Sequence, residues 1–194
     1  IDITPAYAGI NVQGPNSRAL LQQVSPDDFS NSAFPFGTSK EIQLGYATIR
    51  ASRISYVGEL GWELLIPSDM AAHVYETLVE AGQDLELTNV GMHAMNSLRI
   101  EKAYRHWGHD MADEDTPIEA GLEFAVRFDK PGGFIGREAL LKQKECGLVA
   151  KRMVQFLMED PEVMLYHNEP VIRDGTICGY ITSGMYGHTL GGSV

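Results

Sequence analysis

One acidic side chain lies in a segment that otherwise belongs in a protein core. Glu63 is the only charged residue of the apolar run Trp62–Ile66. If this run is a β-strand, alternation places Trp62 on one face and Glu63, with Leu65, on the other. Burying a polar group without a partner costs roughly 1–3 kcal/mol, and burying a charge costs more. We therefore expect the carboxylate either to have a dedicated donor or to lie on an exposed edge strand.

Two kinds of donor would satisfy Glu63. The first is an arginine of the same chain, for example Arg53. The second is a ligand that presents two parallel N–H groups, because a carboxylate accepts such a pair through a charge-assisted bidentate contact. Spacing alone favours a structural explanation, either an arginine of the same chain or an exposed edge strand, over a ligand.

An aromatic residue precedes this run at a distance that suits a binding site. Tyr56 lies seven residues before Glu63, and its amphipathic ring is suited to cover a flat ligand. Packing in the core is an equally plausible role for the same ring. Between the two residues, Gly58 and Gly61 are expected to supply unusual backbone angles or a close approach of chains.

The histidines and cysteines indicate no further site. His106 and His109-Asp110 have a loosely metal-like spacing, but two ligands do not make a metal site and no cysteine or third histidine accompanies them. We interpret them as surface residues at a helix end and predict no metal. Cys146 and Cys178 lack a Cys-x-x-Cys spacing and are expected to be reduced thiols.

Recognised catalytic motifs are absent from the sequence. There is no Gly-x-Ser-x-Gly elbow, no phosphate-binding loop and no dinucleotide-binding glycine fingerprint. Arg99 and the pair Glu101-Lys102 are expected to form ion pairs on the surface of a helix. The residues alone therefore indicate no reaction type.

Charge and composition exclude several classes of partner. The 194 residues include 15 basic and 26 acidic side chains, a formal net charge of −11. The longest basic group is Lys151-Arg152, so a nucleic-acid partner is not expected. No apolar run is long enough for a membrane span, and no leader marks the chain for export.

The chain opens on Ile1 without a methionine and stops without a capping composition, so we expect a segment of a longer protein.

The first part of the chain alternates strand and helix signals. We expect a strand and then a helix capped by Asn16 or Ser17, followed by an antiparallel meander over residues 34–58. A second helix is expected within 67–85, with Ser68 as its N-cap and Gly82 as its C-terminal stop.

The later part changes character near residue 147. We expect a helix within 91–108, a strand over 121–128 and a helix over 136–147. Beyond these lie a strand over 150–159 and a hairpin that turns at Asp174-Gly175. Helical signals then vanish, which predicts one α+β domain over residues 1–147 and an all-β module over 148–194.

Several segments, taken in order, resemble a known family. They are "NVQGP" (11–15), "SYVGELGWELLIP" (55–67), "SLRIEKAYRHWGHDM" (97–111), "TPIEAGLEF" (116–124) and "FIGREALLKQKECGL" (134–148). Their order is similar to that of the aminomethyltransferases, typified by the T-protein of the glycine cleavage system. The resemblance covers essentially the whole chain.

The resemblance implies an architecture and a cofactor. The fold would be the α+β folate-binding aminomethyltransferase fold, with antiparallel sheets and flanking helices, truncated at its N-terminus and followed by the start of a C-terminal β-barrel. "RISYVGELGWEL" and "EKAYRHW" most resemble the folate-binding C-terminal part of sarcosine and dimethylglycine dehydrogenases. In those enzymes a separate upstream FAD domain oxidises an N-methyl amine, and tetrahydrofolate captures the one-carbon unit as 5,10-methylenetetrahydrofolate.

The resemblance also implies roles for individual residues. Glu63 matches the glutamate that binds the pterin ring, and Tyr56 matches a tyrosine of the same pocket. The catalytic aspartate of the family lies upstream of residue 11, so no catalytic residue is expected within this chain. Met95 stands where the T-protein has an arginine, which favours a dehydrogenase-type relative.

Two alternatives remain open beside the dehydrogenase-type reading. One is a stand-alone glycine cleavage T-protein, and the other is a non-catalytic module resembling the pyruvate dehydrogenase phosphatase regulatory subunit. Whether the chain belongs to an active enzyme is therefore left open. The implied partners are folate and a small N-methyl amine or aminomethyl donor. The implied compartment is the cytoplasm, or the mitochondrial matrix in a eukaryote.

Overall fold

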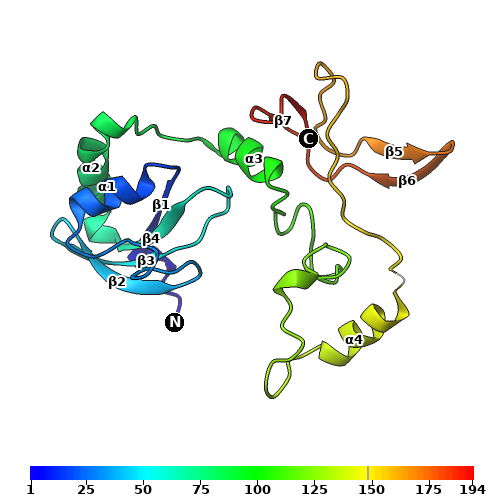
Figure 1. Ribbon diagram of the computed structural model, residues 1–194, viewed down its shortest axis with the longest axis horizontal. Coiled ribbons are helices and arrows are strands. Elements are labelled where there is room, and N and C mark those ends of the chain that lie inside the picture. Colours follow the sequence, from blue (N-terminus) through cyan, green and yellow to red (C-terminus); the bar gives the residue numbers. More distant parts are fainter. Residues whose placement is uncertain (148) are drawn as a thin grey trace. The chain divides into compact units, whose positions relative to one another are not determined.

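The computed structural model describes residues 1–147 and 149–194, which form two compact units, 1–95 and 96–194 (Figure 1). The predicted division between 147 and 148 adjoins residue 148, which lies outside the described residues, and that division stays a prediction. No helix in the described part of the chain is long and apolar enough to cross a membrane.

A four-stranded antiparallel sheet forms the centre of the first unit. Its strands are β1 (Tyr7–Gln13), β2 (Ser39–Leu44), β3 (Ala47–Ser52) and β4 (Gly61–Pro67). Their order in the sheet is β1-β4-β3-β2, so β4 is an interior strand. The predicted first strand and antiparallel meander are thereby confirmed.

Two helices cover one side of this sheet (Figure 1). They are α1 (Ser17–Val24) and α2 (Ala71–Ala81), and both contact β4. Three short 3-10 turns accompany them: η1 (Thr4–Ala6), η2 (Ser68–Met70) and η3 (Gln83–Leu85). The buried side chains of both helices join those of the sheet in one apolar core: Val12, Leu20, Leu21, Phe29, Phe34, Ile42, Leu44, Ala47, Ile49, Ala51, Trp62, Leu64, Ile66, Val74 and Leu78.

The predicted side-chain caps of these helices are wrong, although Gly82 does end α2. Ser17 is buried and its hydroxyl donates to the Leu60 carbonyl at 3.0 Å, while neither it nor Asn16 caps α1. Ser68 lies in η2, and its hydroxyl donates to the Pro5 carbonyl at 2.8 Å. In both cases the hydroxyl donates to a tertiary carbonyl, and its oxygen accepts no hydrogen bond from the first N–H groups of the helix, as an N-cap would.

Helix α3 (Met92–Glu101) begins in the first unit and continues into the second. It ends well before residue 108, since Ala103 adopts a left-handed φ of 56° that a right-handed helix cannot include. Farther on, the strand predicted over 121–128 is wrong, because its middle forms the 3-10 turn η4 (Glu123–Ala125). Helix α4 (Arg137–Cys146) is confirmed.

The C-terminal segment contains two small antiparallel ribbons. Strands β5 (Pro170–Arg173) and β6 (Thr176–Tyr180) form the predicted hairpin, and φ is 51° at Asp174 and 76° at Gly175, as a tight two-residue turn requires. Strands β7 (Tyr186–Gly187) and β8 (Gly192–Ser193) pair with each other. The strand predicted over 150–159 is wrong: its backbone makes single hydrogen bonds, such as Met158 N–H to the Ser193 carbonyl, rather than a ladder.

Candidate ligand site around Glu63

Glu63 lies in the middle of the interior strand β4. It faces Asn11 of β1 on one side and Ser52 of β3 on the other. Trp62 and Leu64, its neighbours in the chain, are buried in the core, whereas Glu63 is half-buried. The alternation predicted from the sequence is therefore confirmed, and an exposed edge strand is excluded for Glu63.

The two faces of the sheet differ because both helices pack on one of them. Trp62 fills the helix-covered face, with the rings of Phe29 and Phe34 edge-on at centroid distances of 5.3 and 5.9 Å. On the opposite face, Leu65 keeps 45% of its surface exposed. Within the first unit, Glu63 thus projects from the helix-free face, where a ligand can reach it.

Arg53 does not neutralise Glu63. Its Nη1 donates to the Phe34 carbonyl at 2.6 Å, and its guanidinium carbon lies 5.6 Å from the centroid of the Trp62 ring. Among residues 1–147 and 149–194, no ion pair includes Glu63. The internal pairing favoured by spacing is therefore wrong, and the carboxylate keeps its capacity to accept hydrogen bonds.

The side chains directly opposite Glu63 are neutral and polar, and the next row of the sheet contains Gly9, Leu65 and the exposed Arg50. The Ser52 hydroxyl donates to the Ser39 hydroxyl at 2.9 Å, and Asn11 is exposed. One row farther along, Leu65 is opposite Gly9, where an added Cβ would meet no atom within 4 Å. A flat molecule that approaches Glu63 therefore meets little steric obstruction from β1.

Tyr56 lies in the loop that leads from β3 into β4, and its side chain is half-buried. The glycines of this loop behave as predicted. Gly58 has a φ of 72°, and a Cβ at Gly61 would clash with Gln13 Oε1 and with the Val12 carbonyl oxygen. The loop is thus closely fitted to β1 at the point where it enters β4.

A second polar cluster, in the second unit, was missed at the sequence level. Arg99 and Asp110 are both buried, and Arg99 Nη1 lies 2.5 Å from Asp110 Oδ2. Arg99 also donates to the Ser183 hydroxyl at 2.7 Å and to the Tyr104 carbonyl at 3.0 Å. The expectation that Arg99 forms an ion pair on the helix surface is wrong. A spacing of eleven residues between partners gives no local signal for this contact.

Hydrogen bonding saturates the Asp110 carboxylate. It accepts from the Ser183 and Thr182 hydroxyls at 2.5 and 2.9 Å and from the His106 N–H at 2.8 Å. Burial raises the pKa of Asp110, but the hydrogen bonds from Ser183 and His106, together with the Arg99 charge, outweigh it and hold this pKa below its ordinary value. Asp110 therefore stays ionised as a structural anion with no free lone pairs for a ligand.

The prediction of surface residues at a helix end is confirmed for the exposure of His106 and His109, but it is wrong for Asp110, which is buried, and α3 already ends at Glu101. Their rings lie 5.7 Å apart, and the His109 ring stacks on His167 at 4.7 Å. In the part of the chain that the structure describes, no three His, Cys, Asp or Glu side chains are placed to hold a metal ion. Cys146 and Cys178 are exposed free thiols.

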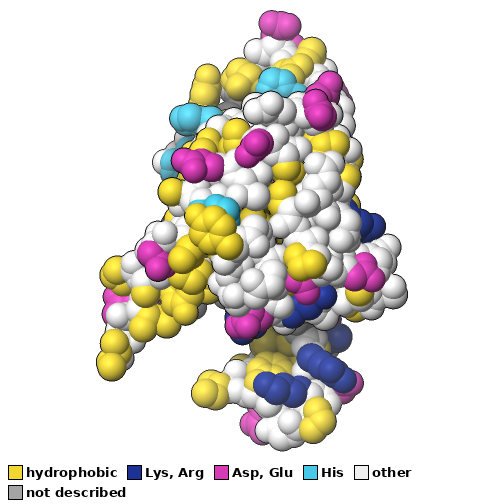
Figure 2. All heavy atoms as spheres, turned by 90° about the vertical axis from the view of Figure 1, so that its left-hand side faces the viewer, with side chains coloured by type: hydrophobic (Ala, Val, Ile, Leu, Met, Phe, Trp, Pro, Cys, Tyr) yellow, Lys and Arg dark blue, Asp and Glu magenta, His cyan; other side chains and the backbone are white. Residues whose placement is uncertain are grey.

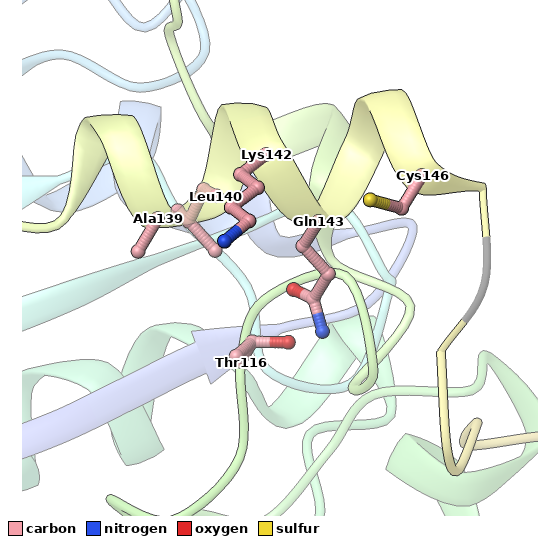
Figure 3. Close-up of a pocket in the computed structure, with 6 residues that line it drawn as sticks. All are labelled: Thr116, Ala139, Leu140, Lys142, Gln143 and Cys146. Atoms are coloured by element: carbon pink, nitrogen blue, oxygen red, sulfur yellow. The ribbon is translucent and has the colours of Figure 1, made fainter.

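A shallow hollow lies beside α4 in the second unit (Figure 3). It has a volume of about 420 Å³ and is open to solvent. Six residues line it: Thr116, Ala139, Leu140, Lys142, Gln143 and Cys146. Its walls are mainly apolar, and neither Glu63 nor Tyr56 contributes to it. Its polar members are Thr116, Lys142 and Gln143, and no carboxylate lines it (Figure 3).

The charge distribution agrees with the acidic composition. Figure 2 shows Asp and Glu side chains dispersed over the visible face, among hydrophobic and neutral ones. Against a net charge of −11, the candidate site uses a single carboxylate flanked by neutral groups, which suits a ligand edge made of N–H donors.

Comparison with known proteins identifies relatives along the whole chain. The family model described as "GCVT N-terminal domain" matches residues 1–130, and "Glycine cleavage T-protein C-terminal barrel domain" matches 151–194. The 4-methylaminobutanoate oxidase (formaldehyde-forming) of Paenarthrobacter nicotinovorans is 48% identical over 100% of this chain and 23% of its own length. The mitochondrial sarcosine dehydrogenase of Homo sapiens is 43% identical over 98% of this chain and 20% of its own length.

A solved structure shows the same fold. The glycine cleavage system aminomethyltransferase T from Bartonella henselae superposes with a TM-score of 0.78 at 24% identity, covering 96% of this chain and 50% of that one. The predicted α+β fold is thereby confirmed. The chain spans about a fifth of the length of the two oxidising relatives that it matches.

Proposed function

Because this chain belongs to the GCVT aminomethyltransferase family, we propose that it is the tetrahydrofolate-binding part of a one-carbon transfer enzyme. The parent protein would resemble the sarcosine and dimethylglycine dehydrogenases. One observation carries the proposal: Glu63, half-buried on an interior strand, has no ion-pair partner in the described residues and projects from the helix-free face.

The proposed role of Glu63 is to orient the pterin ring. The ring N3–H and the 2-amino group form an edge with two adjacent donors, and a carboxylate accepts both in a bidentate contact. A neutral side chain offers only one acceptor oxygen at this place. Tyr56 would line the same ring, since an aromatic face with a polar tip packs well on a flat heterocycle.

The residues present fit a bound folate. Glu63 supplies free acceptor atoms, and the open strip beside Gly9 leaves room for a planar ring. When bound, tetrahydrofolate supplies the nitrogen atoms that accept the one-carbon unit. This chain contributes positioning, because holding an acceptor in a fixed orientation lowers the entropic part of a transfer barrier. We assign no acid–base step to a residue of this chain.

The remaining parts of the proposed enzyme lie outside this chain. The sequence contains no dinucleotide-binding glycine fingerprint, so these residues do not fit FAD. FAD and the site that oxidises a small N-methyl amine would belong to an upstream domain. The compartment would be the cytoplasm, or the mitochondrial matrix in a eukaryote, as for the mitochondrial relative in Homo sapiens.

The proposal is tested by isothermal titration of the full natural protein with tetrahydrofolate, wild type against Glu63→Gln. The substitution keeps the size of the side chain but replaces one acceptor oxygen by an N–H₂ donor that opposes the ligand donors. Hydrogen bonds to a charged group are worth about 1.5–3 kcal/mol, so the affinity should fall roughly 10- to 150-fold.

Glu41→Gln is the matched control for this titration. Glu41 is an exposed glutamate on the outer strand β2, on the same face of the sheet as Glu63. Its replacement should leave tetrahydrofolate binding unchanged. Equal affinities of wild type and Glu63→Gln would remove Glu63 from its assigned role.

A further inference from the structure

We propose that Asn11 and Ser52 determine which pteridine the site accepts, by binding the ring atoms on either side of the edge held by Glu63. This inference rests on the proposed function. It concerns two residues on the strands that flank β4, which no sequence motif connects. It predicts discrimination by the ring substituents rather than by the folate tail.

The sheet register places these residues in one row. Asn11 of β1 and Ser52 of β3 are both directly opposite Glu63 of β4. Directly opposite side chains on one face of an antiparallel pair have Cβ atoms about 4.5–5.5 Å apart. The three side chains therefore form a line across the strands, with the carboxylate between an amide and a hydroxyl.

The chemistry of this row matches the edge of a pterin. Next to the N3–H and 2-amino donors, the edge continues as the 4-oxo oxygen on one side and N1 on the other, and both are acceptors. A donor is therefore needed on each side of the carboxylate. The Asn11 amide and the Ser52 hydroxyl can both donate, whereas apolar residues at either place would leave a ligand acceptor unsatisfied.

Both flanking groups are available to a ligand. Asn11 is exposed, and its side-chain amide makes no hydrogen bond within residues 1–147 and 149–194. The Ser52 hydroxyl donates to the Ser39 hydroxyl at 2.9 Å. Because a hydroxyl also accepts, this pair can reverse, with Ser39 donating and Ser52 free to donate to a ligand.

The neighbouring row of the same sheet face contains an arginine, whereas the row around Glu63 does not. Arg50 of β3 and Gly9 of β1 are both opposite Leu65, two residues along β4 from Glu63. Arg50 is exposed and belongs to no ion pair of the described residues. The row around Glu63 itself holds no cation, so ring recognition there relies on neutral donors.

The experiment compares two ligands by isothermal titration of the full natural protein. They are tetrahydrofolate and its 4-thioxo analogue, in which a weakly accepting sulfur replaces the 4-oxo oxygen while N3 keeps its hydrogen. Asn11→Leu and Ser52→Ala remove the two flanking donors with little change in volume. Each should weaken tetrahydrofolate binding about 3- to 10-fold, the range for one neutral hydrogen bond. The variant that loses the contact to the 4-oxo group should also lose the preference for tetrahydrofolate over the analogue.

Matched controls exist on the same face of the sheet. Gln43→Met removes an exposed amide from the outer strand β2, and Thr48→Val removes a hydroxyl from β3, opposite Gln43. Strands lie about 4.8 Å apart, so Gln43 is roughly 14 Å across the sheet from β1. Neither control should change affinity or preference. Ser52→Thr, which retains the hydroxyl, should keep wild-type binding, and Asn11→Ala replaces Asn11→Leu if the latter fails to fold.

The outcomes separate this inference from the proposed function. If Glu63→Gln weakens binding while both flanking variants keep wild-type affinity and preference, the assignment of Asn11 and Ser52 is overturned and the folate site stands. If Glu63→Gln also binds normally, the role proposed for Glu63 fails, and the assignment of its two neighbours fails with it. If the distant controls weaken binding as much as the flanking variants do, the effect is a general change of the sheet, and the inference fails.

Discussion

At the scale of single residues, the carboxylates of Asp110 and Glu63 are both partly or fully removed from solvent, but their surroundings differ. Asp110 is surrounded by Arg99, two hydroxyls and a backbone N–H, so its oxygens are saturated. Glu63 projects from a sheet without an ion-pair partner in the described residues. The first arrangement stabilises the fold, and the second leaves an anion free to bind a ligand, because only unsatisfied acceptors gain from a new donor.

Asp110→Asn should strongly destabilise the protein. The substitution removes the negative charge but leaves the Arg99 guanidinium buried beside a neutral amide. Breaking a buried ion pair from one side typically costs about 3–5 kcal/mol. Urea unfolding should therefore show a loss of this order in the free energy of unfolding.

Asp129→Asn serves as the comparison for Asp110→Asn. Asp129 forms an ion pair with Arg127 at 3.3 Å, but both side chains are more than 70% exposed. Solvent screens such a pair, so its loss should leave stability close to that of the wild type. A wild-type midpoint for Asp110→Asn would contradict the structural role of Asp110.

The lowered pKa of Asp110 also predicts a pH dependence. Its pKa in the folded protein lies below the ordinary value of 3.8, so the folded state favours the ionised form. The stability that this preference supplies is complete above pH 3.8 and is lost as the pH falls through the folded pKa. The difference in unfolding free energy between wild type and Asp110→Asn should therefore shrink below about pH 4. A constant difference from pH 6 to pH 2 would refute this linkage.

At the scale of elements, β4 connects the core to the candidate site. Its even-numbered side chains, from Trp62 to Ile66, anchor the strand under α1 and α2. Because side chains alternate along a strand, the odd-numbered Glu63 then points away from the helices. A shift of register by one residue would bury the carboxylate and expose the tryptophan, so the core fixes the position of the site.

Gly61→Ala should disturb the entry into β4. A Cβ there would clash with the Val12 carbonyl oxygen, a backbone atom that cannot rotate away. Overpacking of this kind costs typically about 1–3 kcal/mol. We expect a lower thermal midpoint and, because β1 must shift away from β4, weaker tetrahydrofolate binding at Glu63.

The matched substitution for Gly61→Ala is Gly9→Ala on the facing strand β1. An added Cβ at Gly9 meets no atom within 4 Å, and its φ is not in the left-handed region. Its thermal midpoint should equal or exceed that of the wild type. If both alanine variants lowered the midpoint equally, the close approach at Gly61 would not explain the effect.

At the scale of the whole molecule, the two compact units have different interiors. The first contains the large apolar cluster around Trp62, with Phe29 and Phe34 fully buried. The second buries few apolar side chains, among them Ile100 and Ile118, and places an ion pair among them. Apolar burial is the main source of stability, so the first unit should be the more resistant to local opening.

Native-state hydrogen exchange tests this difference. The slowest amides should lie in β1, β3 and β4, whose hydrogen bonds are covered by the apolar cluster. Amides of the hairpin β5–β6, where Ile172, Ile177 and Tyr180 are exposed, should exchange much faster. Equal protection in the two regions would show that packing in the first unit does not control stability.

Local patterns predicted most elements of the first unit. Alternation placed Trp62 and Glu63 on opposite faces, and Asp174-Gly175 marked the later hairpin, because each rule depends on neighbours in the chain. The failures share one physical cause. The Ser17 and Ser68 hydroxyls bond to carbonyls far away in sequence, so their local capping tendency was overridden by tertiary contacts.

The sequence and the tertiary structure each describe a different part of the candidate site. The sequence alone established that a carboxylate interrupts an apolar strand, and the ordered motifs indicated the family, since both are properties of the linear chain. Only the tertiary structure decided that Arg53 bonds elsewhere, that Asn11 and Ser52 flank Glu63, and that Arg99 finds Asp110. These outcomes depend on sheet register and long-range packing, because they bring together residues whose separation in the chain carries no signal of their contact.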